Sequence, residues 1–311
     1  MTVSASAVLT TRARSPRLAW IARHNGYLFV VPMLLYTLAL TVYPVLVNLQ
    51  MSVFNVDVMT FMRGGAAFVW FDNYTKLLHD AAFQKATLLS FVFTCVSIVL
   101  QFTFGFALAL FFAKPFPGSG MLRAFLLLAW LLPSVVVGNI FRWMLDGDYG
   151  PLNYALSALG LLHDKQYWLL DPATALGGVI VANAWVGIPF NMMLLLAGLQ
   201  NISPSLYEAA SIDGAGPVQR FWSITLPQMR PVALGVLLLS FIYTFKVFDL
   251  VYIMTKGGPV DATNTLPIYT FKLTFDFFRF GDGAASSTLL LIGLLIVALG
   301  YSRLIRDEAV H

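Results

Sequence analysis

Residues 175–199 read ALGGVIVANAWVGIPFNMMLLLAGL, an apolar run without a charged side chain. A helix needs about 20 such residues to cross the hydrocarbon core of a bilayer. Comparable runs lie before and after it along the chain. Together they predict an all-α integral membrane protein with six transmembrane helices, at about 27–49, 86–112, 121–145, 175–199, 232–254 and 284–301.

The overall composition is that of a chain lying mostly in lipid. Of its 311 residues, 59% are hydrophobic and 11% charged, whereas soluble domains carry about 25% charged residues. The net charge of +4 is small and scattered among loops, so it indicates no nucleic-acid partner. The single cysteine, Cys95, excludes an internal disulfide and a thiolate metal cluster, and we predict no metal site.

The distribution of Lys and Arg predicts the orientation of the chain. A group of arginines precedes the first run: Arg12, Arg14, Arg17 and Arg23. With six spans both termini share a side, and the loops opposite are longer, so their basic residues are more dilute. We therefore predict a cytoplasmic leader at 1–26, a transmembrane domain at 27–305 and a cytoplasmic tail at 306–311.

The segment 200–231, between the fourth and fifth runs, is too polar to span and has the punctuation of two short helices. Ser203 is a good N-cap with Pro204 at the first helical position, and Gly214 can provide a left-handed stop. Three further prolines mark the second helix, one at its start and two that we expect to limit it before the fifth span: Pro217, Pro227 and Pro231.

Both short helices carry an apolar stripe. In the first helix the stripe comprises Leu206, Tyr207, Ala209 and Ala210, and in the second Val218, Phe221, Trp222 and Ile224. Short amphipathic helices at a membrane surface either lie on the lipid or dock onto a cytosolic partner, and the physical pattern leaves both interpretations open.

Within this loop the sequence reads Glu208-Ala209-Ala210-x-x-Asp213-Gly214-Ala215 and, eight residues later, Ile224-x-Leu226-Pro227. This spacing resembles the EAA signature of permease subunits in binding-protein-dependent ABC importers. The resemblance implies a type I importer permease, with inverted core helices around a central cavity and a coupling helix that sits in a cleft of an ATPase subunit. It implies that the following residues dock the ATPase: Glu208, Ala209, Ala210, Asp213, Gly214, Ala215 and Pro227.

Two flanking stretches resemble the carbohydrate-uptake branch of that family, and in particular its maltose-transporter-like first permease subunit. They are Asn183-x-Trp185-x-x-x-Pro189-Phe190 and Phe248-Asp249-x-x-Tyr252-x-x-Thr255-x-Gly257-Gly258-Pro259. The resemblance implies import of a di- or oligosaccharide, or of a related polyol or glycerol phosphate, across the cytoplasmic (inner) membrane by alternating access. It implies as partners a second homologous permease subunit, two ATPase subunits or domains, an extracytoplasmic solute-binding protein and membrane lipid.

The chain has no Gly-Lys pair and hence no phosphate-binding loop of the Walker type. We therefore expect no cofactor on this chain, with ATP and Mg bound by partner subunits. There is also no H-E-x-x-H or G-x-S-x-G motif. The sequence predicts no catalytic site, and an intramembrane enzyme is disfavoured because no nucleophile–base or metal pair is visible.

Ionisable residues within spans are costly, about 2.5–3.5 kcal/mol at a helix centre, so Lys246 and Asp249 call for an explanation. Their i, i+3 spacing predicts one face of the fifth span, close enough to pair, with Tyr243 and Tyr252 on the same side. They either line a transport path or are structural, the lysine snorkelling and the aspartate binding backbone. The alternative to an ABC importer is an ion-coupled secondary transporter that uses this pair.

If that face lines a cavity, three residues of the fourth span are its natural companions: Asn183, Trp185 and Asn191. Amides bind sugar hydroxyls, and aromatic rings cover the C–H faces of a sugar. The predicted substrate path therefore comprises Asn183, Trp185, Asn191, Tyr243, Lys246, Asp249 and Tyr252. For each of them, helix–helix packing is the alternative.

Overall fold

The computed structural model describes residues 30–308, so the predicted leader 1–26 and the end of the tail 306–311 lie outside the described residues. The chain divides into two units, residues 1–50 and 51–311. The first contains most of an apolar helix, Val30–Ser52, which includes a π-helical segment, η1 (Leu38–Val42), and continues as α2 (Tyr43–Ser52). Pro44 is the second residue after the π segment, whose wider turn relieves the clash of a proline ring with the preceding turn.

The second unit begins with a folded loop rather than an irregular one. It contains two short strands and two short helices, β1 (Phe54–Asn55), α3 (Val58–Arg63), β2 (Ala67–Phe68) and α4 (Asp72–His79). The strands pair antiparallel, with Phe54 opposite Phe68. Buried Asn73 closes the loop, because its amide donates hydrogen bonds to the carbonyls of Ser52 (2.9 Å) and Phe54 (3.0 Å).

Four long helices carry the second unit: α5 (Ala81–Phe112), α9 (Ala175–Gln200), α12 (Leu226–Phe245) and α15 (Phe280–Glu308). Helix α5 lies along α9, and α12 contacts both. The approach of α5 to α9 depends on Gly105, where an added Cβ would be 2.7 Å from Cβ of Asn191. Small residues at such contacts let membrane helices pack closely.

The predicted third span is a bent pair of helices, α6 (Ser119–Leu131) and α7 (Ser134–Met144), that meet at 95°. The break falls at Leu132 and Pro133 because the residue before a proline is driven into an extended conformation. Over residues 30–308 the structure has five helices apolar and long enough to span, or six if this pair is one span. The all-α expectation is confirmed, and the number of spans is fixed only to five or six.

The fifth span differs from the sequence expectation at both ends. The second short helix does not stop before it, because α11 (Pro217–Arg220), the π segment η2 (Phe221–Thr225) and α12 form one continuous helix. The expected interruption by Pro227 and Pro231 was therefore wrong. Pro227 falls in the first turn of α12, directly after the π segment, where a missing N–H costs little.

At its other end the span was predicted to reach residue 254, but α12 ends at Phe245 and a separate helix, α13 (Asp249–Thr255), follows. The bend brings Phe248 against the rings of Tyr252 and Phe271, at centroid distances of 5.1 and 5.0 Å. The local sequence would allow α12 to continue, but the chain bends after Phe245 so that these aromatic rings can pack together.

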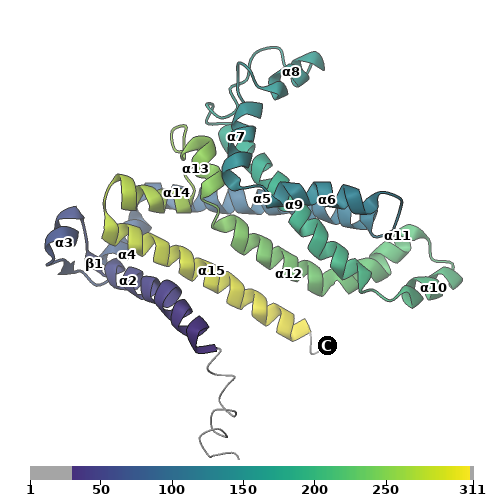
Figure 1. Ribbon diagram of the computed structural model, residues 1–311, viewed down its shortest axis with the longest axis horizontal. Helices are drawn as coiled ribbons and strands as arrows, with labels where there is room; N and C mark the ends of the chain where they lie inside the picture. The colour runs from purple at the N-terminus through teal and green to yellow at the C-terminus, as the bar shows by residue number, and fades with distance from the viewer. Residues whose placement is uncertain (1–29, 309–311) are drawn as a thin grey trace, which may run out of the picture. The chain divides into compact units, whose positions relative to one another are not determined.

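The remaining short helices lie at the ends of the long ones: α8 (Pro151–Ala158), α10 (Pro204–Ile212), α14 (Leu266–Phe271) and the π segment η3 (Lys272–Asp276). Helix α10 follows the end of α9, while α8 precedes its start (Figure 1). Because α9 has 26 residues, its ends are about 39 Å apart. We refer to the α10 end as the coupling end and to the α7, α8 and α13 end, which the Lys and Arg distribution predicts to face outward, as the outer end.

Candidate functional site

The coupling segment, residues 200–231, owes its shape to the signature glycine. Gly214 has φ +79° and stops α10 as predicted. The amides of Gly214 and Ala215 donate to the carbonyls of Ser211 (3.2 Å) and Ala210 (2.8 Å), which is the Schellman arrangement. Ser203 occupies the N-cap position, although its hydroxyl bonds that of Ser205 rather than a backbone amide.

Most of the signature side chains point away from the rest of the chain. Glu208, Ala209, Asp213, Gly214 and Pro227 are exposed, whereas Ala210 and Ala215 are half-buried. An added Cβ at Gly214 would meet nothing within 4 Å. Packing within the described part of the chain therefore does not explain why most of these positions carry the residues they do.

A groove of about 480 Å³ runs beside α10. Glu208 and Arg220 contribute opposite charges to its wall, and Arg220 donates a hydrogen bond to Ser211 at 2.8 Å. Tyr207 fixes α10 to the start of α12 through a 2.9 Å bond to the hydroxyl of Thr225. Ile212, which the sequence pattern did not mark as a site residue, is 87% exposed next to the signature. Its position at the end of the apolar stripe of the first short helix is the sequence feature that could have identified it.

The mid-helix cavity, a second candidate site, has a volume of about 280 Å³ and lies between α5, α6, α9 and α12. It is lined by Gln101, Trp130, Asn183, Val186, Gly187, Phe190, Ser240, Tyr243, Thr244 and Val247. Asn183 and Tyr243, two of the residues predicted for the substrate path, line this cavity. Gln101 and Trp130 were missed, although a lone glutamine in the apolar run of α5 was a visible signal.

Aromatic rings form one wall of the mid-helix cavity. Trp130 stacks on Phe190, with ring centroids 5.6 Å apart and planes 27° apart. Tyr243 meets Phe190 edge-on at 5.9 Å and is 54% exposed, so this wall is open in the single chain. A flat, partly exposed aromatic surface of this kind suits the C–H face of a sugar ring.

Two amide side chains also line the cavity, those of Gln101 and Asn183. Gln101 donates to the backbone carbonyl of Asn183 at 3.1 Å. The side-chain amide nitrogen of Asn183 is buried and has no hydrogen-bond partner among the described residues. An unpaired buried donor is costly, and a bound hydroxyl would satisfy it.

Five residues of the predicted path do not line the mid-helix cavity, and three of these make contacts elsewhere in the helix bundle. Asn191 is fully buried, and it accepts a 3.0 Å bond from Ser240 and donates to the carbonyl of Gly187, so it joins α9 to α12. Trp185 packs edge-on against Phe141. Tyr252 belongs to the aromatic cluster on α13 described above. For these three the packing alternative describes the structure.

The expected pairing of Lys246 with Asp249 on one helix face was wrong. The helix ends between them, and no ion pair joins them in the part of the chain that the structure describes. Asp249 lies in the first turn of α13, where the helix dipole favours an acidic side chain. Lys246 instead places its ammonium 5.0 Å from the ring centroid of Tyr243, beside the cavity.

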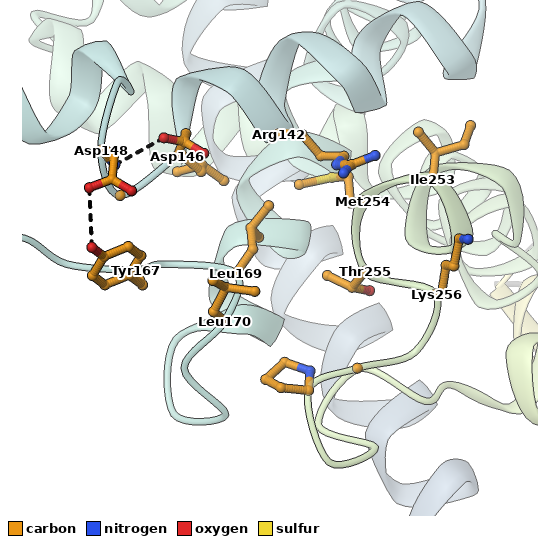
Figure 2. A pocket seen from close by; sticks show the side chains of 14 residues that line it. Arg142, Asp146, Asp148, Tyr167, Leu169, Leu170, Ile253, Met254, Thr255 and Lys256 are labelled. Carbon is orange, nitrogen blue, oxygen red and sulfur yellow. Dashed lines mark hydrogen bonds between the residues drawn. The ribbon is translucent and has the colours of Figure 1, made fainter.

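Figure 2 shows a third hollow, about 410 Å³, at the outer end between α7 and α13. Arg142, Met254 and Lys256 line one part of it, and Asp146 and Asp148 another. In the figure the backbone amide of Asp148 bonds the Asp146 carboxylate (2.9 Å), and its own carboxylate accepts from Tyr167 (3.2 Å).

The charges around this hollow are stabilised locally. A hydrogen bond from Lys165, 2.9 Å long, is the main cause that lowers the pKa of Asp148, and a second from Tyr167 adds to it. The same contact raises the pKa of Lys165. Over residues 30–308 no group of three or more His, Cys, Asp or Glu is arranged to hold a metal ion.

Several long apolar helices, a partly open cavity lined by apolar side chains and a few amides, and an exposed polar segment at one end define a helical membrane protein. Residues 101–306 match the family described as binding-protein-dependent transport system inner membrane component. The chain belongs to this family, which comprises permease components of ABC transporters and not catalytic subunits. The resemblance drawn from the EAA signature is thereby confirmed.

Related proteins extend this similarity over nearly the whole chain. The trehalose/maltose transport system permease protein MalF of Thermococcus litoralis is 36% identical over 288 residues, 91% of this chain and 95% of that protein. The sulfoquinovosyl glycerol transport system permease protein SmoG of Agrobacterium fabrum is 33% identical over 281 residues, 90% of each chain. A solved bacterial ABC transporter involved in import of the acidic polysaccharide alginate has the same fold, with a TM-score of 0.80 at 22% identity, covering 94% of this chain and 99% of that one.

Proposed function

We propose that this chain is a permease subunit of an ATP-driven importer that carries a sugar, or a related polyol or glycerol phosphate, into the cell by alternating access. It lies in the cytoplasmic membrane, with both termini and the coupling segment on the cytoplasmic side. A second permease completes the path, two ATPase subunits or domains bind ATP and Mg, and a solute-binding protein delivers the cargo. The arginines before the first span support the orientation.

The observation that carries this proposal is the exposure of the coupling segment. Glu208, Asp213 and Gly214 have a fixed backbone but few contacts within the chain. The backbone of this surface is held by the chain itself, but its exposed side chains find contacts only when a partner protein binds. Closure of the ATPases would move this segment, and the permease would alternate between two packings of its helices.

The mid-helix cavity supports a sugar as the cargo. The stacked rings of Trp130 and Phe190 and the amides of Gln101 and Asn183 line one cavity of about 280 Å³, and this combination of groups suits a sugar. Relatives named as trehalose/maltose and lactose permeases agree with this class. We assign Asn183 and Tyr243 to the path by their place in the cavity.

Co-purification with the ATPase tests the coupling role. Glu208→Lys and Gly214→Asp are expected to abolish recovery of the ATPase with the tagged permease while membrane insertion stays normal. Asp164→Lys is the matched control, because it makes the same charge change on an exposed residue of the α8–α9 loop. Unchanged recovery with Glu208→Lys would contradict the docking role.

Uptake into proteoliposomes tests the energy source and the cargo site. Transport should require ATP and persist when proton and sodium gradients are collapsed, whereas an ion-coupled transporter would show the reverse. Trp130→Ala and Asn183→Leu should lower sugar uptake by about tenfold or more, since each removes one wall of the cavity. Trp143→Ala changes an exposed tryptophan outside the cavity and should leave uptake unchanged.

A further inference from the structure

Lys246 is a cation beside a cavity that has no charge of its own. Its ammonium lies 5.0 Å from the ring centroid of Tyr243, which lines the mid-helix cavity together with Val247. None of the described residues that line this cavity is Asp, Glu, Lys or Arg. Lys246, directly after α12, therefore places a formal charge beside a cavity whose described lining has none.

Among residues 30–308 the ammonium of Lys246 has no carboxylate partner. The ion pairs described for residues 30–308 join Lys165 to Asp148, Lys272 to Asp261 and Arg279 to Asp282. The contact with the Tyr243 ring stabilises the cation only in part and leaves its three N–H donors available. Lys246 directly follows the last residue of α12 and is exposed, so its ammonium is accessible to a molecule at the open side of the cavity.

An anion that enters with the cargo would satisfy this lysine. A sugar ring stacked on Trp130, with its hydroxyls toward Asn183, occupies the neutral part of the cavity. A substituent that projects past Tyr243 then reaches the ammonium of Lys246.

We propose that Lys246 is a specificity-determining residue that selects sugars bearing an anionic group, a carboxylate, sulfonate or phosphate, over neutral sugars of the same size. The inference rests on the proposed function, because it takes the mid-helix cavity as the sugar site. A contact to a lipid phosphate, or to a carboxylate of the second permease, would occupy the lysine instead.

The test uses the full complex of both permeases and the ATPase subunits in lipid nanodiscs, without the binding protein. Glucose and glucuronate are the probes, because they differ only in a hydroxymethyl group against a carboxylate. Calorimetry should give a dissociation constant about tenfold lower for glucuronate, as expected for one charge-assisted hydrogen bond. Lys246→Gln should bring the ratio close to one, and Lys246→Arg should largely preserve it.

Controls separate the possible outcomes. Lys76→Gln removes the same charge from an exposed position on α4 and should leave the ratio unchanged. A ratio near one in the unmodified complex, no glucuronate binding, or a ratio that survives Lys246→Gln overturns the inference. So does a Lys246→Gln variant that alters only the dependence on anionic lipid.

Trp130→Ala distinguishes this inference from the proposed function. If it weakens the binding of both sugars while Lys246→Gln leaves their ratio intact, the cavity is the sugar site and only the role of Lys246 fails. If it weakens neither, the assignment of the cavity fails as well.

Discussion

The coupling segment and the contact between α5 and α9 both contain unusual residues, but the reasons for those residues differ. At the α5–α9 contact, Gly105 and Asn191 touch each other and their neighbours in the same chain. In the coupling segment, Glu208 and Asp213 are exposed and form no side-chain hydrogen bond or ion pair in the described part of the chain. Substitutions at the first site should therefore affect folding, and those at the second should affect association.

The largest effect should follow from Gly105→Val. The added Cβ would lie 2.7 Å from Cβ of Asn191 and 3.1 Å from the backbone nitrogen of Met192, which cannot move without shifting α9. Overpacking of this kind costs about 1–3 kcal/mol or more. Thermal unfolding in detergent should show a clear loss of stability. Gly120→Val is the control, because its added Cβ meets nothing within 4 Å. Equal stability of the two variants would break the comparison.

A smaller effect, confined to association, is expected for Ile212→Asp. Its side chain is 87% exposed at the end of α10, so the permease alone should unfold within about 0.5 kcal/mol of the unmodified chain. An apolar anchor in an interface carries about 1–2 kcal/mol, so the affinity for the ATPase should fall about tenfold. Binding measured by surface plasmon resonance checks this. A loss of thermal stability without a loss of affinity would reverse the assignment of this residue.

Ser240→Ala should have a modest effect on stability. Its hydroxyl donates a hydrogen bond to the buried side-chain amide oxygen of Asn191 at 3.0 Å. Hydrogen bonds between membrane helices contribute about 0.6 kcal/mol on average, so unfolding in detergent should show a loss of that order. Ser302→Ala, on an exposed hydroxyl of α15, is the control. An increase in stability would mean that the α9–α12 bond is not favourable.

The smallest effect concerns pH. Tyr269 joins α14 to the start of α5 by donating to Asp80 at 3.0 Å, and burial is the main cause that raises the pKa of its phenol. Because the folded pKa lies above the unfolded value of about 10, the stabilising contribution is fully present below pH 10 and is lost as the pH rises further. Unfolding should be insensitive to this group from about pH 6 to 9, and Tyr269→Phe should reduce the decline above pH 10. An identical alkaline decline in the variant would contradict this origin.

The sequence predicted well the features that depend on local chemistry. The stop at Gly214 and the start at Pro217 both follow from backbone restrictions of single residues. The end of α12 at Phe245 was not predicted, because no glycine or proline lies there and the apolar pattern continues through Val251. Contacts with Phe271, far along the chain, decide that bend.

The residues that line the mid-helix cavity could likewise be predicted from the sequence only in part. Asn183 was found because a polar residue in an apolar run is visible in the sequence, whereas Trp130 resembles any other apolar residue until α6 packs on α9. Asn191 shows that visibility in the sequence does not tell a path residue from a helix–helix contact. Its amide is equally visible, but only the structure places Ser240 opposite it.

The continuous helix Pro217–Phe245 has a mechanical consequence. It has 29 residues, so it is a rod about 43 Å long. Its first turns belong to the coupling segment, and Tyr243, near its last turn, lines the cavity. A rigid tilt of about 5° around its midpoint moves each end by about 2 Å in opposite directions. In the proposed mechanism, this one helix would carry a movement of the coupling segment to the cavity. Its length fixes how far Tyr243 moves for a given displacement at Pro217.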